Sequence, residues 1–233
     1  MLPQSLDTHI DIEKIQISMI RKESFAKKIF QMCSLSQSTR QLSRRAIKRA
    51  NPTLNEQESD ILFIKYIYGS DLAIRFRHNL LNNRPQIPMR KTEIIEAALP
   101  VAKAFDELGI LYYIGGSIAS SVYGLPRATQ DVDMVTDLKP QHVSPLVEKL
   151  NSTYYIDKDL ILEAISGGKS FNLIHLDTMI KIDVFMIKDE PYHRSALQRR
   201  RKDTLNVENE NALNFYIASS EDIILNKLDW FRM

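Results

Sequence analysis

Residues 110–135 read ILYYIGGSIASSVYGLPRATQDVDMV, and this stretch decides the fold. The apolar run 110–114 is typical of a short buried strand. Two glycines follow it, and the small residues of 117–123 favour a short helix that ends at Gly124. Residues 132–135 predict a second strand with acidic residues at alternate positions. The stretch therefore predicts a strand, a glycine turn, a helix and another strand.

The sequence on either side continues this alternation within residues 91–233. Asp177-Thr178 separates two β-rich runs, which predicts an antiparallel hairpin, and Ser219 with Asp222 forms a capping box before the last helix. We predict an α+β fold with a mixed β-sheet flanked by helices. The expected helices span 92–108, 140–150 and 223–231, and the expected strands span 171–176, 179–186 and 214–218.

Residues 1–90 hold one of the seven glycines, Gly69, and predict a helical unit. Thr53 and Glu56 match a capping box for a helix that runs to Gly69, after which a further helix begins. The polar segment NNRPQIP at 82–88 has two prolines and no periodicity. We therefore predict an α-helical accessory domain over 1–88 and a second domain over 89–233.

Composition excludes several classes of protein. The 233 residues are 44% hydrophobic and 26% charged, as in ordinary globular chains. A single cysteine, Cys33, excludes a disulfide framework, and no apolar run is long enough to span a membrane. Because the first residues also lack a signal-peptide layout, we expect a cytoplasmic protein without a membrane partner. The net charge of +2 divides into +7 for residues 1–90 and −5 for 91–233.

Gly115, Gly116 and Ser117 lie between the predicted strand and helix. Glycines there let the backbone approach an anion, and the N-terminus of the next helix offers unpaired N–H groups and a positive dipole end. The alternative is an ordinary turn, because two glycines before a helix are common in turns. Neither a dinucleotide fingerprint nor a P-loop pattern is present.

Three acidic residues are candidate metal ligands. A strand places Asp131 and Asp133 on one face, where the carboxylates repel each other unless a cation lies between them. Asp183 shares the face of its strand with Lys181 and Phe185. Ligand sets made only of oxygen favour Mg²⁺ or Mn²⁺. The alternatives are a solvated strand end for the pair and a polar outer face for Asp183.

These motifs, in this order, resemble the polymerase-β-like nucleotidyltransferase superfamily. The form GGSxAxxxYGxxRxTxDxD is most similar to the bacterial AbiEii-type branch, known from type IV toxin–antitoxin systems. The segment SSEDIILNKLDWF is similar to a later motif of that branch, a helix whose lysine faces the nucleotide phosphates. The resemblance covers about residues 91–233. Its motifs are Gly115-Gly116-Ser117, Arg127-x-Thr129-x-Asp131-Val132-Asp133, Asp183 and Lys227.

The resemblance implies a role for each of these residues. The glycine turn with Ser117 would hold the phosphates of a nucleoside triphosphate, and the three aspartates would bind Mg²⁺ or Mn²⁺. Asp183 would also help to take the proton from the acceptor hydroxyl. Arg127, Thr129 and Lys227 would complete the nucleotide site. A turn residue is the alternative for Thr129, and a salt bridge is the alternative for Arg127.

We therefore expect a Mg²⁺-dependent transferase that moves a nucleoside monophosphate from an NTP to a hydroxyl on tRNA, a protein or a small molecule. The resemblance also implies the toxin of a toxin–antitoxin pair, with an antitoxin-like partner. The alternative is a non-catalytic protein that binds nucleotides or a partner. Members of the branch usually continue with further helices after the position of Lys227, so we expect a short or truncated form.

Two basic runs are candidate nucleic-acid contacts. Residues 40–49 (RQLSRRAIKR) are typical of a solvated helix face, with nucleic-acid binding as the alternative. Residues 199–202 (RRRK) follow Asp183 closely enough to guide an RNA acceptor.

Overall fold

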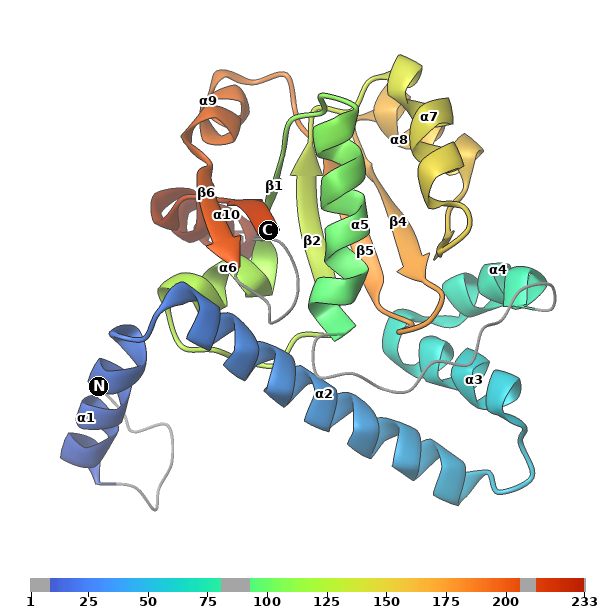
Figure 1. The fold of residues 1–233 in the computed structure, drawn as a ribbon, viewed down its shortest axis with the longest axis horizontal. Helices are drawn as coiled ribbons and strands as arrows, with labels where there is room; N and C mark the ends of the chain where they lie inside the picture. The colour runs from blue at the N-terminus through green and yellow to red at the C-terminus, as the bar shows by residue number, and fades with distance from the viewer. Residues whose placement is uncertain (1–8, 81–92, 206–212, 233) are drawn as a thin grey trace.

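The computed structural model describes residues 9–80, 93–205 and 213–232 (Figure 1). These residues form a mixed seven-stranded sheet of order β3-β4-β5-β2-β1-β7-β6. β2 pairs in parallel with β5, and β1 pairs in parallel with β7, while the other neighbouring strands are antiparallel. The predicted mixed sheet and hairpin are thus confirmed. The strands are β1 Tyr112–Ile114, β2 Asp131–Thr136, β3 Tyr154–Tyr155, β4 Ser170–His175, β5 Lys181–Met186, β6 Arg201–Leu205 and β7 Leu213–Ile217.

The helices confirm the α+β class, and most lie within a few residues of the predicted bounds. The sequence reasoning missed β3, β6, α8 and α9. Both ends of α8 carry residue types that are typical of helix caps, so the sequence could have predicted this helix. Asp157 at the start accepts bonds from two backbone N–H groups, and Gly168 ends the helix in the left-handed region. The helices are α1 Ile10–Arg21, α2 Phe25–Ala50, α3 Glu56–Tyr68, α4 Ser70–Leu80, α5 Glu93–Glu107, α6 Gly116–Tyr123, α7 Pro140–Leu150, α8 Lys158–Gly167, α9 Pro191–Arg199 and α10 Ser220–Arg232.

The predicted capping box of α3 is wrong by two residues. Asn55, not Thr53, is the N-cap: its side chain accepts a bond from the N–H of Glu58 at 2.9 Å, and Glu58 accepts one from the N–H of Asn55 at 2.9 Å. Both pairs have the same spacing, and Asn caps helices at least as well as Thr. The start of α4 at Ser70, after Gly69, confirms the predicted break between the two helices.

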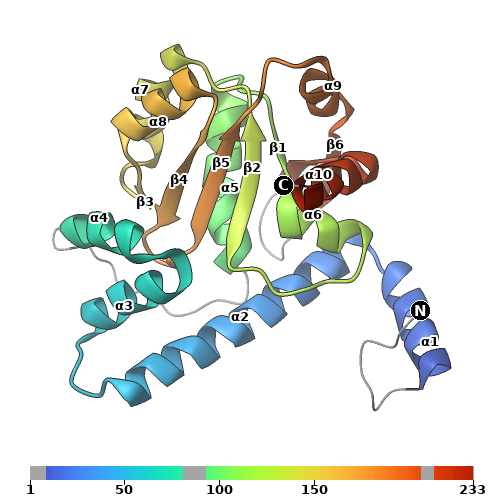
Figure 2. The same cartoon turned by 180° about the vertical axis from the view of Figure 1, so that it is seen from behind.

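The sheet has one covered and one open face at its centre. α5 packs against one face (Figure 1), and in Figure 2 no helix passes in front of β2 and β5. Every second residue of these strands is fully buried on the α5 side, including Val132, Met134 and Ile182. The residues between them are partly exposed on the open face. α6 and α10 pack against each other beside this open face.

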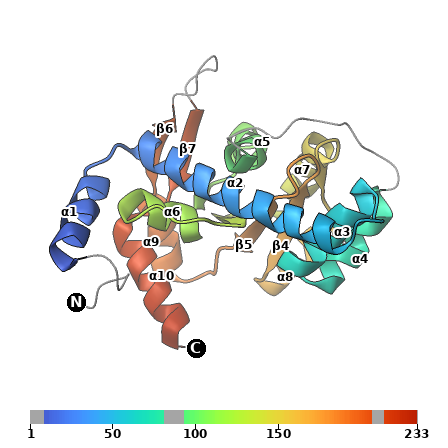
Figure 3. The same ribbon diagram turned by 90° about the horizontal axis from the view of Figure 1, so that it is seen from below.

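The N-terminal helices share hydrophobic cores with the sheet. α2 runs across one end of the molecule (Figure 3), and its Ile29 and Met32 are buried in the main core with α5 and β1. Phe63 of α3 belongs to a second core that includes Ile174 of β4. The predicted boundary at 82–88 lies outside the described residues. Helices within residues 9–80 therefore share hydrophobic cores with the sheet, and this holds wherever a domain boundary is placed.

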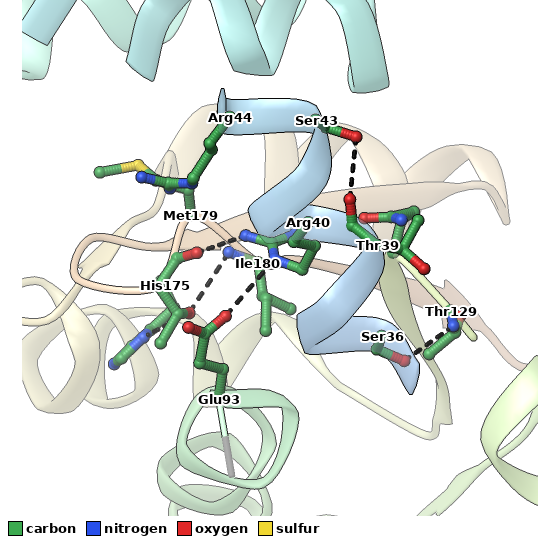
Figure 4. A network of polar contacts seen from close by, with 12 residues as sticks. Ser36, Thr39, Arg40, Ser43, Arg44, Glu93, Thr129, His175, Met179 and Ile180 are labelled. Carbon is green, nitrogen blue, oxygen red and sulfur yellow. Dashed lines mark hydrogen bonds and ion pairs between the residues drawn. The ribbon is translucent and has the colours of Figure 1, made fainter. Parts of the chain in front are cut away.

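Arg40 connects α2 to three other parts of the chain (Figure 4). Its side chain is buried, donates to the carbonyl of Thr178 at 2.5 Å and to the hydroxyl of Tyr68 at 3.3 Å, and lies 3.5 Å from the carboxylate of Glu93. Arg44, one turn later, pairs with Asp60 at 2.9 Å. These two arginines of the basic run 40–49 therefore hold the fold together, a role that neither interpretation of the run had predicted.

Across the described residues, no helix is both long and apolar enough to cross a membrane.

Candidate functional site

A cleft of about 750 Å³ lies on the open face of the sheet, where α6 and α10 meet β1, β2 and β5. It brings together eight of the nine residues predicted from the sequence, from segments up to about a hundred positions apart. Thr129 is the ninth and does not line the cleft. The predicted residues in the wall are Gly115, Gly116, Ser117, Arg127, Asp131, Asp133, Asp183 and Lys227.

The parallel register of β2 and β5 places the three carboxylates side by side. Asp133 lies opposite Asp183, and Asp131 lies opposite Lys181. Alternate residues of both strands face the cleft, while their neighbours are buried under α5. The predicted shared face of Asp183, Lys181 and Phe185 is thus confirmed. Asp183 does lie on a partly exposed face of its strand, as the alternative interpretation predicted. This face, however, forms part of the wall of the cleft.

The glycine turn is shaped around Asp133. The N–H of Gly115 donates to the backbone carbonyl of Asp133 at 2.9 Å, which joins the turn to β2. Gly116 has a φ of +52°, and a Cβ there would lie 1.7 Å from Oδ2 of Asp133. No other amino acid leaves room for that carboxylate. The close approach was not readable from the sequence, because it depends on the pairing of β1 with β2.

Ser117 and Arg127 face each other at the N-terminus of α6. The guanidinium of Arg127 donates to Oγ of Ser117 at 2.7 Å. α6 begins at Gly116, so its first N–H groups and its positive dipole end lie beside the same cleft. A hydroxyl, a guanidinium and a helix N-terminus on one side of the carboxylates form a site suited to an anion.

α10 brings Asn226 and Lys227 to the wall of the cleft. Its N-terminus is fixed by Ser219, whose Oγ accepts from the N–H of Asp222 at 3.2 Å, as the predicted cap requires. Asp222 is buried and accepts two bonds from Arg199, at 2.6 and 3.3 Å. Although burial alone would raise it, the pKa of Asp222 is held below its ordinary value by the bonds from Arg199 and Ser219.

The second basic run, 199–202, is thus partly committed to the fold. Besides the bonds of Arg199 to Asp222, the guanidinium of Arg200 lies 4.5 Å from the ring centre of Tyr216, and that of Arg201 lies 5.6 Å from that of Tyr123. Such contacts stabilise a protein surface without any nucleic acid. Guidance of an RNA acceptor by this run stays a prediction.

Thr129 lies behind Asp131. It is 5% exposed, and its hydroxyl donates to Oδ1 of Asp131 at 3.1 Å. Its own N–H donates to Oγ of Ser36 on α2 at 2.9 Å. The residue therefore orients one carboxylate of the cleft from behind. Its contact with a nucleotide stays a prediction from the resemblance.

The sequence reasoning missed Lys181 as a site residue. Its ammonium pairs with Oδ2 of Asp183 at 2.7 Å and lies 5.4 Å from the ring centre of Tyr68. It is thus a cation paired with one carboxylate of the cleft, and its charge also acts on Asp133. The spacing Lys-x-Asp within one strand was a usable signal, because it places the two side chains on the same face.

Burial, together with crowding of negative charge, raises two pKa values in the cleft. Burial, followed by the charges of Asp131 and Asp183, raises the pKa of Asp133 to about 6. Burial also raises the pKa of Asp183, and the hydrogen bond and charge of Lys181 oppose that rise. The cleft therefore favours a cation that would offset these charges.

The raised pKa of Asp133 predicts that the cleft costs stability at neutral pH. Because the folded pKa lies above the unfolded one, the folded state holds its proton more tightly, and stability falls as the pH rises from about 4 to about 6. The rise corresponds to about 3 kcal/mol. We expect Asp133→Asn to unfold at higher urea concentration than the wild type at pH 7.5, with the difference vanishing near pH 3.5. Equal stabilities at pH 7.5 would contradict this.

The donor set fits a hard divalent cation in its chemistry. All three acids supply oxygen, which Mg²⁺ and Mn²⁺ prefer, and a cation there would offset the charges of Asp131 and Asp183 that help to raise the pKa of Asp133. In the part of the chain that the structure describes, no three His, Cys, Asp or Glu side chains are already arranged to hold a metal ion. Lys181 takes one oxygen of Asp183. The three acids therefore suit the metal ion if Asp183 gives up its ion pair with Lys181 and binds the metal ion instead.

Comparison with known proteins adds a likeness in structure. No protein-family model matches the chain, and no curated protein matches it. Among solved structures, the chain is similar to a protein of Thermotoga maritima that is provisionally described as a nucleotidyltransferase. The similarity covers 62% of this chain and 88% of that one, at 13% sequence identity and a TM-score of 0.41. The AbiEii-type branch therefore stays a prediction from the sequence motifs.

Proposed function

We propose that the protein is a metal-dependent nucleotidyltransferase, which moves a nucleoside monophosphate from an NTP to a hydroxyl. The observation that carries this proposal is the placement of three carboxylates beside a glycine turn and a helix N-terminus in the wall of one cleft. One side of the cleft suits cations and the other suits anions. A magnesium nucleotide presents both, because its phosphates are anionic and its metal ion needs oxygen ligands.

The triphosphate would bind at the N-terminus of α6. Gly116 and Ser117 would meet its oxygens through the backbone and the hydroxyl, and Arg127 would add a guanidinium beside Ser117. Lys227 would approach from α10, the helix that packs against α6. This arrangement supports binding of the phosphates by positive charge on two sides, without a P-loop.

Asp131, Asp133 and Asp183 would hold Mg²⁺ or Mn²⁺ beside those phosphates. When bound, such ions neutralise the phosphate oxygens and stabilise the attacking and leaving groups. Asp183 lies on β5, at the edge of the carboxylate group away from the glycine turn, and would accept the proton of the acceptor hydroxyl. Pyrophosphate leaves towards the side of α6.

The acceptor would enter along a second hollow of about 570 Å³ that adjoins the first. Both hollows are lined by Val135 and Phe185, and the ring of Phe185 is 41% exposed. Lys169 and Lys188 line the second hollow only. An apolar floor with lysines suits a molecule that has a flat or apolar part and negative charge. The terminal nucleotide of an RNA and an acidic protein segment both meet this description.

A non-catalytic binding protein is the second candidate. The ion pair of Lys181 with Asp183 favours it, because a lysine already supplies a positive charge among the acids. A buried cluster of acids in which the charges of Asp131 and Asp183 add to the raised pKa of Asp133 is nevertheless a cost that a binding surface does not need. The toxin role and an antitoxin-like partner rest on the sequence resemblance alone, and we propose them on that basis only.

Calorimetry with a nonhydrolysable NTP tests the proposal. We expect binding that requires Mg²⁺, and we expect Asp131→Asn to weaken it at least tenfold, since that residue would hold the metal ion. Without Mg²⁺, repulsion between phosphates and carboxylates should abolish the signal. The matched control is Asp137→Asn, which removes an acid just after the same strand, where it pairs with Lys139 outside the cleft.

Two results would contradict the proposal. No heat with any of the four nucleotides in the presence of Mg²⁺ would favour the non-catalytic candidate. Equal weakening by Asp131→Asn and Asp137→Asn would show that the effect is one of general charge. Incubation with each labelled NTP and total cellular RNA or protein then identifies the acceptor by the label that it carries.

A further inference from the structure

We infer that the hydroxyls of Tyr68 and Ser36, on the N-terminal helices, hold the carboxylate strands in their working positions. Both are positioning residues, since neither lines the cleft. The inference rests on the proposed function and adds a role for a part of the chain that lies outside the sequence resemblance. It gives α2 and α3 a supporting role behind the active site.

Tyr68 joins the first residues of β2 and β5. Its hydroxyl donates to the carbonyl of Gln130 at 2.5 Å, directly before Asp131. It accepts from the N–H of Lys181 at 3.3 Å, at the start of β5. One oxygen atom therefore contacts both parallel strands just before each reaches its carboxylate. The ammonium of Lys181 also lies 5.4 Å from the centre of the Tyr68 ring, so that the residue contacts the cation of the cleft as well.

Ser36 holds the segment that leads into β2. Its Oγ is buried, donates to the carbonyl of Met32 and accepts from the N–H of Thr129 at 2.9 Å. The hydroxyl of Thr129 in turn donates to Asp131 at 3.1 Å. A chain of two hydrogen bonds therefore runs from the middle of α2 to a carboxylate oxygen of the cleft. Figure 4 shows Ser36 and Thr129 at one end of the network that surrounds Arg40.

Arg40 fixes Tyr68 in turn. Its guanidinium donates to the Tyr68 hydroxyl at 3.3 Å and to the carbonyl of Thr178 at 2.5 Å, and it contacts Glu93 of α5. These partners come from three separate elements, and the guanidinium is almost fully buried. A buried and multiply bonded arginine cannot shift without leaving several polar groups unpaired. The position of the Tyr68 hydroxyl is thereby defined by the fold and not by solvent.

Such bracing matters because the strands begin where Asp131 and Lys181 lie. Strand ends lack the bonds that hold a strand's interior, and loss of a carboxylate's alignment by about 1 Å costs a catalytic site about a hundredfold in rate. Bonds from outside the sheet to Gln130, Thr129 and Lys181 remove that freedom. The helices thus set the spacing at which the acids meet a metal ion.

Amide hydrogen exchange tests the bracing without any substrate. We expect Tyr68→Phe to speed exchange of the Lys181 N–H by about tenfold, and Ser36→Ala to do the same for Thr129, since each N–H loses its acceptor. The matched controls are Tyr66→Phe, whose side chain is exposed two residues earlier on α3, and Ser38→Ala, whose exposed hydroxyl donates to the carbonyl of Ser34 within α2. Equal exchange in each variant and its control would overturn the inference.

Metal affinity tests the positioning role itself. Titration of Mn²⁺, with the free ion followed by electron paramagnetic resonance, should give about tenfold weaker binding for Tyr68→Phe than for Tyr66→Phe, at equal thermal stability after correction for folded fraction. Faster exchange with unchanged Mn²⁺ affinity would reduce Tyr68 to a structural residue and overturn the inference. If the wild type binds no Mn²⁺, the proposed function fails, and the bracing is then decided by exchange alone.

Discussion

Replacing Asp183 with asparagine should reduce transfer in a single turnover by about a hundredfold to ten-thousandfold, the range for loss of a general base. Asparagine keeps the size of the side chain and its place in β5, but it lacks the charge that holds a metal ion and the basicity that accepts a proton. NTP binding should survive in weakened form, because the glycine turn and α6 are untouched. Single-turnover transfer and Mg²⁺ affinity, measured on this one variant, separate the two effects.

Asp203→Asn is the matched control for this experiment. Asp203 lies on β6, its side chain is 20% exposed against 18% for Asp183, and it pairs with Arg201 as Asp183 pairs with Lys181. It lies outside the cleft. We expect full transfer from the control. If Asp183→Asn also keeps full transfer and metal affinity, Asp183 has neither proposed role, and the residue is a polar strand position paired with Lys181.

Replacing Gly116 with alanine should abolish metal-dependent NTP binding, or weaken it by at least about a hundredfold. The new Cβ would lie 1.7 Å from Oδ2 of Asp133, so either the carboxylate or the turn must move. The φ of +52° adds a backbone cost of about 1–2 kcal/mol for any residue with a Cβ. Loss of function should therefore exceed what the loss of stability explains.

Gly109→Ala separates the two contributions. Gly109 has a φ of +66°, and a Cβ there would meet nothing within 4 Å. We expect this control to lose about 1–2 kcal/mol of stability and no nucleotide binding. Calorimetry on both variants, with urea unfolding beside it, is the measurement. Equal nucleotide affinity for Gly116→Ala and Gly109→Ala would show that the turn does not need its close approach to Asp133.

Local pattern was enough to predict the elements that build the cleft. The apolar run before Gly115 gave a strand, and the alternation around Asp131 and Asp183 assigned each acid to the half-exposed side of its strand. A strand's side chains alternate with a period of two, so one buried neighbour fixes the face of the other residues. The capping-box pattern of Ser219 and Asp222 likewise predicted the start of α10.

Longer-range features were beyond pattern. The sequence did not show that β2 and β5 pair in parallel with Asp133 opposite Asp183, because register depends on elements far apart in the chain. The charged run around Arg40 was interpreted as a solvated surface. Nothing in the local sequence indicates the carbonyl and the carboxylate that Arg40 contacts in the folded protein.

The sequence by itself determined which residues can form strands, helices and turns, and which acids share a face, because these depend on residues within a few positions of one another. Only the tertiary structure decided that the three acids meet, that Gly116 must lack a side chain beside Asp133, and that Tyr68 and Ser36 contact the strands from the N-terminal helices. The physical reason is distance along the chain. These contacts join residues separated by up to 113 positions. Burial and hydrogen bonding depend on how close two groups lie in space, and a local sequence pattern does not contain that information.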